Sequence, residues 1–441
     1  MSQQVRIERW NAQLEGEGEL QKRIYSFRYT SIGDHVTFEE RGKRKRKYLK
    51  VLEVDKVLPK EQAPCKSFGQ CGGCAGQHIP YQEQFFLKTD RIIQEFAELT
   101  GQNMQSVAAS QIYGHRNRMD FTVQPGPIIG FRQAGNFRVT ANVEKCLIQS
   151  EWANNELKNL RNWLQQYPDL PRKRNHGPGY LKYITLRKAI YTDDTMLILT
   201  FSQEIKNTEL LATLQSEVLQ HTTAKNIIFC YNRPQSEVSA QGDFEVLSGN
   251  PYYIETLLEK KLEIPFDSFF QPNPSGFLPI LEFLKKHLAD IKTEELLDIF
   301  CGNGFFSILL GEHFSKLQGF DIVKSSIQQA TQQLEKIYPH KETNYQVIDL
   351  YSIKNSTFLE TIHHNTVAII DPPRNGIGTK VLDILQKLPI KNLFYVSCNP
   401  KVQLQELQVL QSTYTVKEGL ITDPYPHSPH LESVVFLQRK T

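Results

Sequence analysis

The sequence predicts an α/β fold joined to two β-rich parts. Residues 1–60 alternate short apolar and polar runs between glycine-containing turns, which is typical of a small antiparallel, OB-like barrel. Residues 61–265 continue with strand-like runs and helical insertions, so we expect a β-rich central domain there. From about residue 290 strands alternate with helices, which indicates βαβ units and a Rossmann-like, mostly parallel, doubly wound sheet in a C-terminal domain, 266–441.

The first two parts carry two basic segments. RGKRKRKYLK (41–50) has seven basic residues and no acid, and residues 171–188 interleave basic with aromatic side chains. Such a run is either a contact surface for nucleic acid or a solvated face. Between these segments we expect helices at 81–100 and 151–166, and a hairpin at 183–202 that turns near Thr192.

The C-terminal part alternates more regularly. We expect strands at 295–300, 316–321, 344–349, 366–371 and 392–398. We expect helices at 305–314, 325–338, 380–388 and 402–411. The last two strands, 414–421 and 433–439, are separated by a proline-rich loop, which favours a closing antiparallel pair.

Composition narrows the class of protein. Charges nearly balance, with 51 Lys and Arg against 48 Asp and Glu, so net charge alone indicates no partner. No apolar run is long enough to cross a membrane and no leader-like apolar segment is visible, so we expect a soluble, cytoplasmic monomer without a membrane partner. Seven cysteines, an odd number in a long chain, argue against a disulfide framework and for metal or catalytic roles.

The loop DIFCGNGFFS (298–307) indicates a nucleotide site. Its glycines allow close approach of a ligand to the backbone, but position 307 is Ser, so the dinucleotide pattern GxGxxG fails. Later strands end in Asp321, Asp349 and Asp371. Acids at successive strand ends suit a nucleoside with a cationic tail, so S-adenosylmethionine fits better than NAD. Turn glycines with solvated acids are the alternative.

The segment CKSFGQCGGC contains Cys65, Cys71 and Cys74, and Cys146 follows as a possible fourth ligand. Zinc sites usually use two C-x2-C pairs, whereas here three cysteines are contiguous and glycines flank the sulfurs. The spacing therefore favours an iron–sulfur cluster over zinc.

Six motifs together resemble one family. They are FFQPN (269–273), DIFCGNG (298–304), GFD (319–321), DPPR (371–374), VSCNP (396–400) and DPYPHSPHLE (423–432). With the cysteine segment, they resemble the RNA 5-methyluridine methyltransferases, in the iron–sulfur branch that modifies 23S ribosomal RNA. The resemblance implies a TRAM domain of OB type at 1–60, a 4Fe–4S cluster in 61–265, and an S-adenosylmethionine-dependent methyltransferase domain at 266–441.

The resemblance also implies roles for single residues. The cluster ligands would be Cys65, Cys71, Cys74 and Cys146. The contacts to S-adenosylmethionine would be Gln271, Phe300, Phe305, Asp321, Asp349 and Asp371. Cys398 falls on the nucleophile and Glu432 on the general base. The chain departs from the family where Phe305 replaces the usual Asn and Asp321 the usual Glu, so a contact from Phe305 would need its backbone or its packing.

The chemistry needs one thiol and one carboxylate. A thiolate that adds to carbon 6 of uracil makes carbon 5 nucleophilic, and a base must later remove the carbon 5 proton. Cys398 and Glu432 would supply them, with His427 and His430 as possible proton relays. The target base must leave its stack, so we expect flipping from folded or single-stranded RNA.

Other interpretations remain open at the sequence level. The target could be transfer RNA rather than 23S ribosomal RNA. DPP[RY]-type motifs also occur in amino-methyltransferases of nucleic-acid bases. A radical S-adenosylmethionine enzyme would use a different three-cysteine spacing. The non-enzymatic alternative is an RNA-binding ribosome-assembly factor.

Overall fold

A computed structural model gives the fold of this chain. It describes residues 2–42, 48–57, 62–172, 179–203, 205–352, 362–363 and 366–440. Residues 43–47 of the first basic segment and 173–178 of the second lie outside this description. Among the described residues, no helix combines the length and apolar character that a membrane span needs.

The N-terminal part consists of short strands around a small core. The strands are β1 (Gln3–Arg6), β2 (Arg9–Trp10), β3 (Gly16–Leu20), β4 (Arg23–Phe27), β5 (His35–Arg41) and β6 (Tyr48–Asp55). In the described residues they form two antiparallel sheets, β1-β5-β6 and β2-β3-β4. The chain passes from one sheet to the other at Ile7 and Glu8, since Ile7 N donates to Asp34 O whereas Glu8 N donates to Glu17 O. Val5 and Phe27 nevertheless share one buried cluster across both sheets.

The central part is a curved sheet with helices on one face. Its strands are β8 (Arg118–Gln124), β9 (Ile128–Gln133), β10 (Asn136–Asn142), β11 (Leu181–Lys188), β12 (Thr195–Phe201), β13 (Asn226–Tyr231) and β14 (Asp243–Ser248), in the order β10-β9-β8-β11-β12-β13-β14. The predicted hairpin is confirmed as β11 and β12. The helices α2 (Glu151–Leu164) and α3 (Thr208–His221) bury Leu157, Leu160 and Val218 against alternate residues of the sheet. A hairpin, β15 (Tyr252–Leu257) and β16 (Lys260–Pro265), follows and packs toward the C-terminal part.

The C-terminal part is the doubly wound domain that the sequence predicts. Its strands are β17 (Glu295–Ile299), β18 (Lys316–Asp321), β19 (Glu342–Val347), β20 (Thr366–Ile370), β21 (Asn392–Ser397), β22 (Tyr414–Thr422) and β23 (Glu432–Arg439). Its helices are α4 (Pro274–Ala289), α5 (Phe305–Leu310), the 3-10 turn η2 (Gly311–His313), α6 (Lys324–Ile337), α7 (Thr379–Lys387) and α8 (Pro400–Leu410). The sheet runs β19-β18-β17-β20-β21-β23-β22-β7, where β7 is Met104–Val107, and β23 is antiparallel to both of its neighbours.

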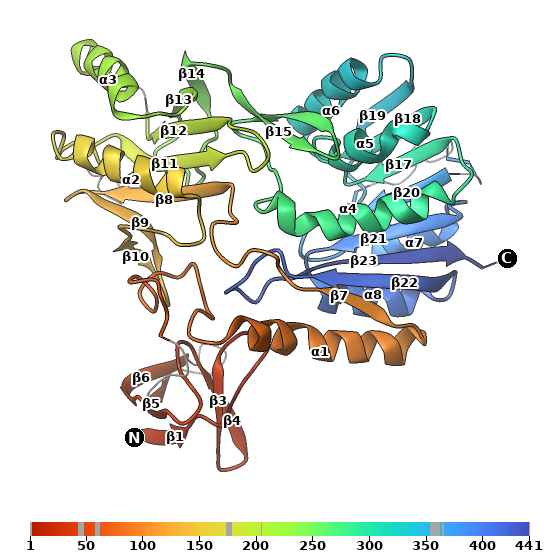
Figure 1. Ribbon diagram of the computed structural model, residues 1–441, viewed down its shortest axis with the longest axis horizontal. Helices are drawn as coiled ribbons and strands as arrows, with labels where there is room; N and C mark the ends of the chain where they lie inside the picture. The colour runs from red at the N-terminus through yellow and green to blue at the C-terminus, as the bar shows by residue number, and fades with distance from the viewer. Residues whose placement is uncertain are drawn as a thin grey trace.

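Each face of this sheet has its own buried cluster. Phe277 of α4 and Leu334 of α6 join one cluster, which includes Val367 of β20. On the other face, Leu385 of α7 and Leu407 of α8 pack with the opposite side of the strands. The ribbon shows the helices arranged on both sides of the sheet, beside the central part and above the N-terminal strands (Figure 1).

Two elements that we expected within the central domain join the C-terminal sheet instead. The helix α1 (Tyr81–Thr100) buries Ile92 and Phe96 in the cluster that contains α8 (Figure 1). The strand β7 (Met104–Val107) pairs in parallel with β22, with Met104 opposite Gly419. Sequence pattern indicates that an amphipathic helix is buried, but it does not indicate which surface it covers.

Candidate active site

The largest described cavity lies at the carboxyl ends of the parallel strands, where open α/β sheets place their ligands. Its volume is about 650 Å³. It gathers seven of the predicted site residues: Gln271, Phe300, Asp321, Asp349, Asp371, Cys398 and Glu432. Tyr425, His430 and Arg374 also line it. The strand ends thus collect acids, one thiol and one guanidinium around a single space.

Strand register places Cys398 next to Glu432. The last antiparallel pair between β21 and β23 is Ser397 opposite Ser433. Cys398 follows β21 directly, and Glu432 begins β23, so the two residues occupy the next position of the same ladder. A thiol and a carboxyl group that lie 34 positions apart in the chain therefore share one wall of the cavity.

Burial raises the pKa of two carboxyl groups of the cavity, those of Asp371 and Glu432. Burial raises the pKa of the Asp371 carboxyl to about 7, and the nearby Asp298 adds to the shift. Burial also raises the pKa of Glu432 well above its usual range, with a further contribution from Asp371, while Arg374 opposes it. Several carboxylates cannot all ionise in one poorly solvated space unless a positive charge joins them. The cavity therefore favours a cationic ligand.

The thiol is subject to the same constraint. Burial, followed by the charges of Glu432 and Asp371, raises the pKa of Cys398 to about 12, although Arg374 lowers it. The thiol is then neutral near pH 7 in the ligand-free site, and the thiolate is the nucleophilic form. Attack by Cys398 must be accompanied by transfer of its proton to a neighbouring base.

The loop after β17 has a backbone conformation that lets a ligand approach it closely. Phe300 has φ +60°, which is strained for a residue with a side chain, and Gly302 follows with φ +54°. Gly302 N donates to Asp321 Oδ2 at 3.1 Å, so the end of β18 fixes this loop. Asp298 lies beneath it and accepts from Ser307 Oγ at 2.8 Å. Asp298 and Ser307 thus hold the loop, while Asp321 connects it to the cavity.

Phe305 is placed differently from the other predicted cofactor contacts. It is not among the residues that line the large cavity, but lines a smaller one of about 90 Å³ beside Gln271 and Phe300. Its ring packs edge-on against Phe270 and Phe277. The phenyl side chain therefore has a packing role beneath the site, as its replacement of a polar residue suggests.

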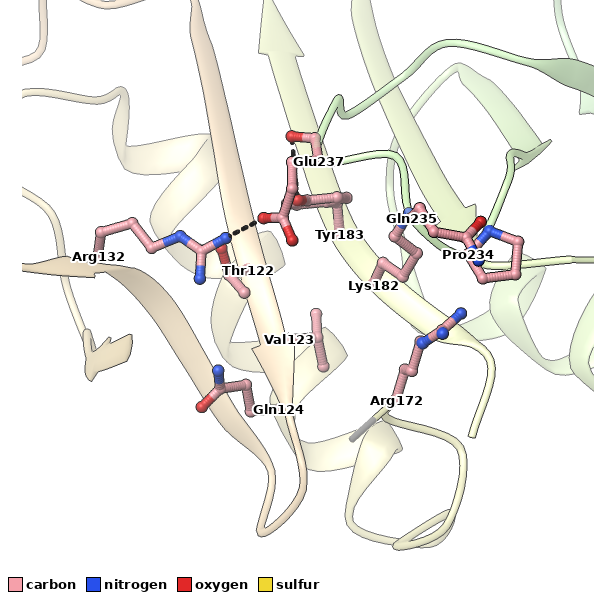
Figure 2. Close-up of a pocket in the computed structure, with 10 residues that line it drawn as sticks. All are labelled: Thr122, Val123, Gln124, Arg132, Arg172, Lys182, Tyr183, Pro234, Gln235 and Glu237. Carbon is pink, nitrogen blue, oxygen red and sulfur yellow. Dashed lines mark hydrogen bonds and ion pairs between the residues drawn. The ribbon is translucent and has the colours of Figure 1, made fainter. Parts of the chain in front are cut away.

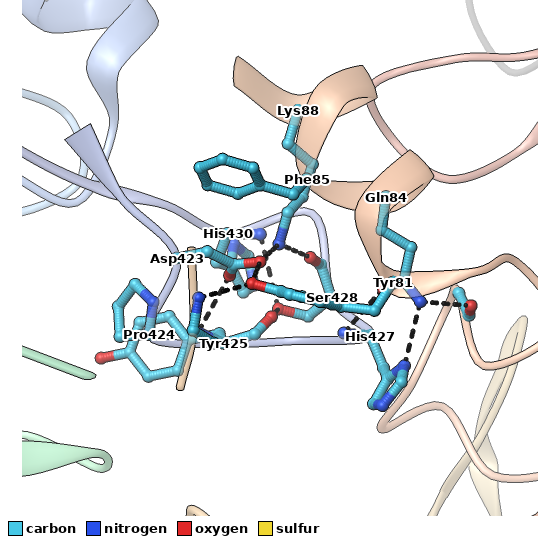
Figure 3. A network of polar contacts seen from close by, with 12 residues as sticks. Tyr81, Gln84, Phe85, Lys88, Asp423, Pro424, Tyr425, His427, Ser428 and His430 are labelled. Atoms are coloured by element: carbon cyan, nitrogen blue, oxygen red, sulfur yellow. Dashed lines mark hydrogen bonds and ion pairs between the residues drawn. The ribbon is translucent and has the colours of Figure 1, made fainter. Parts of the chain in front are cut away.

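The loop 423–430 is held by a buried network (Figure 3). Lys88 Nζ of α1 lies 2.6 Å from Asp423 Oδ2, with both side chains fully buried, and it also donates to Ser428 O. Gln84, one turn earlier, accepts from His427 N and contacts His427 Nδ1 at 3.1 Å. The helix α1 therefore fixes the loop that leads into Glu432.

The two histidines of this loop have different surroundings. His430 lines the cavity, and its Nδ1 lies 3.1 Å from Arg374 Nη2. His427 is 2% exposed, stacks on Tyr113 at 4.7 Å and is not among the residues that line the cavity. The predicted proton-relay role is thus geometrically open to His430, whereas His427 lies in the supporting network.

The four predicted cluster ligands surround one small cavity. Cys65, Cys71, Cys74 and Cys146 line a space of about 90 Å³ together with apolar side chains. Gly73 N donates to Cys71 Sγ at 3.4 Å. Burial raises the pKa of Cys74 to about 11 and that of Cys146 to about 12. In the described residues no three His, Cys, Asp or Glu side chains are grouped closely enough to hold one metal ion.

Comparisons with known proteins bear on the family. A family model for tRNA (uracil-5-)-methyltransferases matches residues 258–440. A relative from Leptospira interrogans, described as an uncharacterized RNA methyltransferase, is 41% identical over 100% of this chain and 98% of its own length. The chain belongs to the RNA 5-methyluridine methyltransferase family.

Other members of this family extend the comparison. A tRNA (uracil(54)-C(5))-methyltransferase from Pyrococcus furiosus is 28% identical over 93% of this chain and 94% of its own length. The crystal structure of a tRNA (uracil-54, C5)-methyltransferase from Pyrococcus abyssi, in complex with S-adenosyl-L-homocysteine, aligns with a TM-score of 0.76. That alignment covers 99% of this chain and 100% of the other at 22% identity, and it shows a common fold.

Within this family fold, sequence reasoning missed several residues that surround the cavity. Arg374 is not among the predicted site residues, although its guanidinium lies beside the acids of the cavity. Exposed apolar side chains, Ile322 and Tyr351, form another wall. Each follows a strand-end acid by one or two positions, and that spacing is the signal that could have identified them.

Proposed function

We propose that this chain transfers a methyl group from S-adenosylmethionine to carbon 5 of a uridine in RNA. The adjacency of Cys398 and Glu432 at the end of the β21–β23 ladder carries the proposal. This chemistry requires a thiol and a carboxylate that reach one base from one wall. Family membership supports the same reaction.

The residues of the cavity fit S-adenosylmethionine. Asp321 ends β18, Asp349 follows the neighbouring strand β19 by two residues, and both can accept from ribose hydroxyls. Ile322, 59% exposed, and Tyr351, 40% exposed, offer apolar surface to a purine. Asp371 would favour a positive charge nearby. When bound, S-adenosylmethionine supplies the methyl group as an electrophile.

The side chains would act in a fixed order. Cys398 Sγ forms a bond to carbon 6 of the uracil, and its proton passes to a carboxylate of the cavity other than Glu432. Carbon 5 gains electron density and accepts the methyl group. Glu432, in its ionised form, then removes the proton from carbon 5, and the bond between carbon 6 and Sγ breaks. The carboxyl group that took the proton of Cys398 returns it to the thiolate, so the thiol is restored. Arg374 stabilises the negative charge that the carboxylates carry in turn.

We further propose that Cys65, Cys71, Cys74 and Cys146 hold a 4Fe–4S cluster. Two observations support a cluster over a single ion. The four thiols line one cavity of about 90 Å³, and Gly73 N–H is directed at Cys71 Sγ. The cluster would be structural, since no residue of the catalytic wall lines this cavity.

The proposal also concerns which class of RNA carries the methylated uridine. The resemblance to the iron–sulfur branch supports 23S ribosomal RNA. The Pyrococcus furiosus relative, whose name gives uracil 54 of tRNA as its target, supports transfer RNA as a second candidate. Mass-spectrometric mapping of 5-methyluridine in both RNA classes, from a strain without this gene, separates the two. Loss of the mark from one class identifies the target.

Variants of the two catalytic residues test the reaction. Cys398→Ala should abolish both methyl transfer and a covalent RNA adduct. Glu432→Gln should still permit attack and methylation but not removal of the carbon 5 proton, so a methylated adduct should accumulate and survive denaturing electrophoresis. Each loss of rate should reach about 10²–10⁴-fold or more.

Asp383→Asn, on α7 and outside the cavity, serves as the control. It should leave both rate and adduct level unchanged. Full activity of Cys398→Ala would contradict covalent catalysis and favour an amino-methyltransferase. Equal loss in both variants, without an adduct from Glu432→Gln, would exclude Glu432 as the base and make His430 the next candidate.

A further inference from the structure

A second cavity lies on the central sheet, on the face opposite α2 (Figure 2). Its volume is about 230 Å³, and it shares no lining residue with the large cavity. Its walls are Thr122, Val123, Gln124, Arg132, Arg172, Lys182, Tyr183, Pro234, Gln235 and Glu237. We call it the Arg172 cavity. Arg172 and Lys182 belong to the basic and aromatic segment 171–188, which the catalytic site does not use.

Among the described residues, some of the charged side chains of this cavity have partners of opposite charge and others do not. Arg132 forms an ion pair with Glu237. Lys182 Nζ donates to Asn232 Oδ1 at 2.7 Å, and burial lowers its pKa to about 8. In the part of the chain that the structure describes, no carboxylate pairs with Arg172. Arg132 and Arg172 lie on different sides of β8 residues 122–124 (Figure 2). The cavity thus has more positive than negative charge, and one guanidinium is available to an anion.

One strand joins this cavity to the active site. Asn117, immediately before β8, donates through Nδ2 to Gln271 O at 3.0 Å, beside the large cavity. Thr122 and Gln124 of the same strand reach the Arg172 cavity. At 3.3 Å for each residue the separation is about 17–23 Å. A stacked RNA strand would cover that distance with roughly five to seven nucleotides.

The surface between the two cavities is polar. Even-numbered residues of β8 face away from α2, because Phe121 and Val123 are buried on the α2 side. On that face Asp120, whose side chain is 34% exposed, accepts from Arg118 and from the buried Thr185 Oγ1 at 2.8 Å. A polar path of this kind is suited to a sugar–phosphate backbone rather than to an apolar partner.

We propose that the Arg172 cavity binds a backbone phosphate of the substrate RNA at a distance from the methylated uridine. This inference rests on the proposed function, since it takes the strand that enters the large cavity to be RNA. Arg172 would pair with the phosphate, and Thr122 and Gln124 would donate to its oxygens. The site would add affinity for long RNA without contacting the reacting base.

Binding of oligouridylates of two lengths tests this. The fluorescence anisotropy of labelled 5-mers and 15-mers is measured over a salt series with the full chain and with Arg172→Glu. For the variant we expect about three- to tenfold weaker binding of the 15-mer, and a slope of log affinity against log salt smaller by about one. The advantage of the 15-mer over the 5-mer should shrink, because two connected contacts act together only on the longer strand.

Lys158→Glu is the matched control, since Lys158 is exposed on α2 at the opposite face of the same sheet. It makes the same charge reversal and should change neither affinity nor slope. Arg172→Gln, a milder change, should give an intermediate effect and covers the case in which the Glu variant does not fold.

Two results would overturn the proposal. One is an Arg172→Glu variant that matches Lys158→Glu with both oligouridylates. The other is unchanged RNA affinity with lost affinity for poly-glutamate, which would assign the cavity to an acidic peptide. Failure of the proposed function looks different: the wild-type chain would then methylate no RNA, while the length and salt effects of Arg172→Glu would persist.

Discussion

Asp371 shows how a single side chain of the candidate active site weakens the fold that holds it. Its pKa is raised to about 7 by burial and by Asp298. An acid with a raised pKa stabilises the folded state only while it is protonated. That contribution is complete below about pH 4 and is lost as the pH rises through about 7. The protein therefore keeps a destabilising carboxylate at neutral pH where a cationic ligand would compensate for it.

We expect Asp371→Asn to raise the melting temperature of the ligand-free protein at about pH 8, because the amide carries no charge to bury. The gain should shrink steadily between about pH 7 and about pH 5, where the native carboxyl is increasingly protonated. Calorimetry across this range measures it. Asp349→Asn is the control, because hydrogen bonds lower the pKa of Asp349 and its replacement should bring no gain at high pH. A gain independent of pH would indicate repacking instead.

The sequence predicted which residues belong to the site better than it predicted the surroundings of individual side chains. Cys398, Glu432 and the strand-end acids were predicted because short motifs fix them at the ends of strands, and the structure brings them to one cavity. The different surroundings of His427 and His430 were not predictable, because both lie in one loop and only packing against Tyr113 separates them. Phe305 could be expected to pack but not placed against particular rings.

At the scale of elements, one helix and one loop form a unit. The loop 423–430 contains no helix or strand, and yet Asp423 and His427 are buried in it, and Lys88 and Gln84 of α1 bond to it. The strands and helices from 295 onward were predicted well, since each has its own apolar period. The attachment of α1 and β7 was not, because their partners come from the last part of the chain.

We expect Lys88→Met to destabilise the protein by about 3–5 kcal/mol, because it leaves the buried Asp423 carboxyl without its cation. The double variant Lys88→Met with Asp423→Asn should lose less, since no charge is left unpaired. Thermal unfolding measures both. Arg91→Met on the same helix breaks an exposed pair with Glu95 and should cost less than about 1 kcal/mol. Similar losses for Lys88→Met and Arg91→Met would mean that the buried pair contributes little.

At the scale of the whole molecule, the cysteine cavity joins distant parts of the chain. Cys146 comes from beyond α1 and β7, whereas the other three cysteines precede them. Ala75 N and Gly76 N, next to Cys74, both donate to His427 O in the loop beside the active site. A group held by the four thiols would therefore fix the N-terminal half of the chain against the loop 423–430.

We expect protein purified without oxygen to be brown and to contain iron and acid-labile sulfide. Cys146→Ser should lose both and should become more sensitive to protease near residues 62–80, because the segment would lose its anchor. Cys230→Ala provides the control, since Cys230 is buried in the sheet outside this cavity. Near-stoichiometric zinc without iron or sulfide would contradict a cluster, and equal metal content in the two variants would exclude Cys146 as a ligand.

The pairing of β7 with β22 has a consequence for synthesis of the chain. Met104 leaves the ribosome long before Gly419, its partner in the sheet. At typical translation rates the interval is roughly 15–60 s. Throughout that time the backbone donors and acceptors of β7 have no strand to pair with, and α1 has no sheet to cover. The nascent chain must therefore keep the unpaired β7 and the uncovered apolar face of α1 from associating with other chains until β22 has been synthesised.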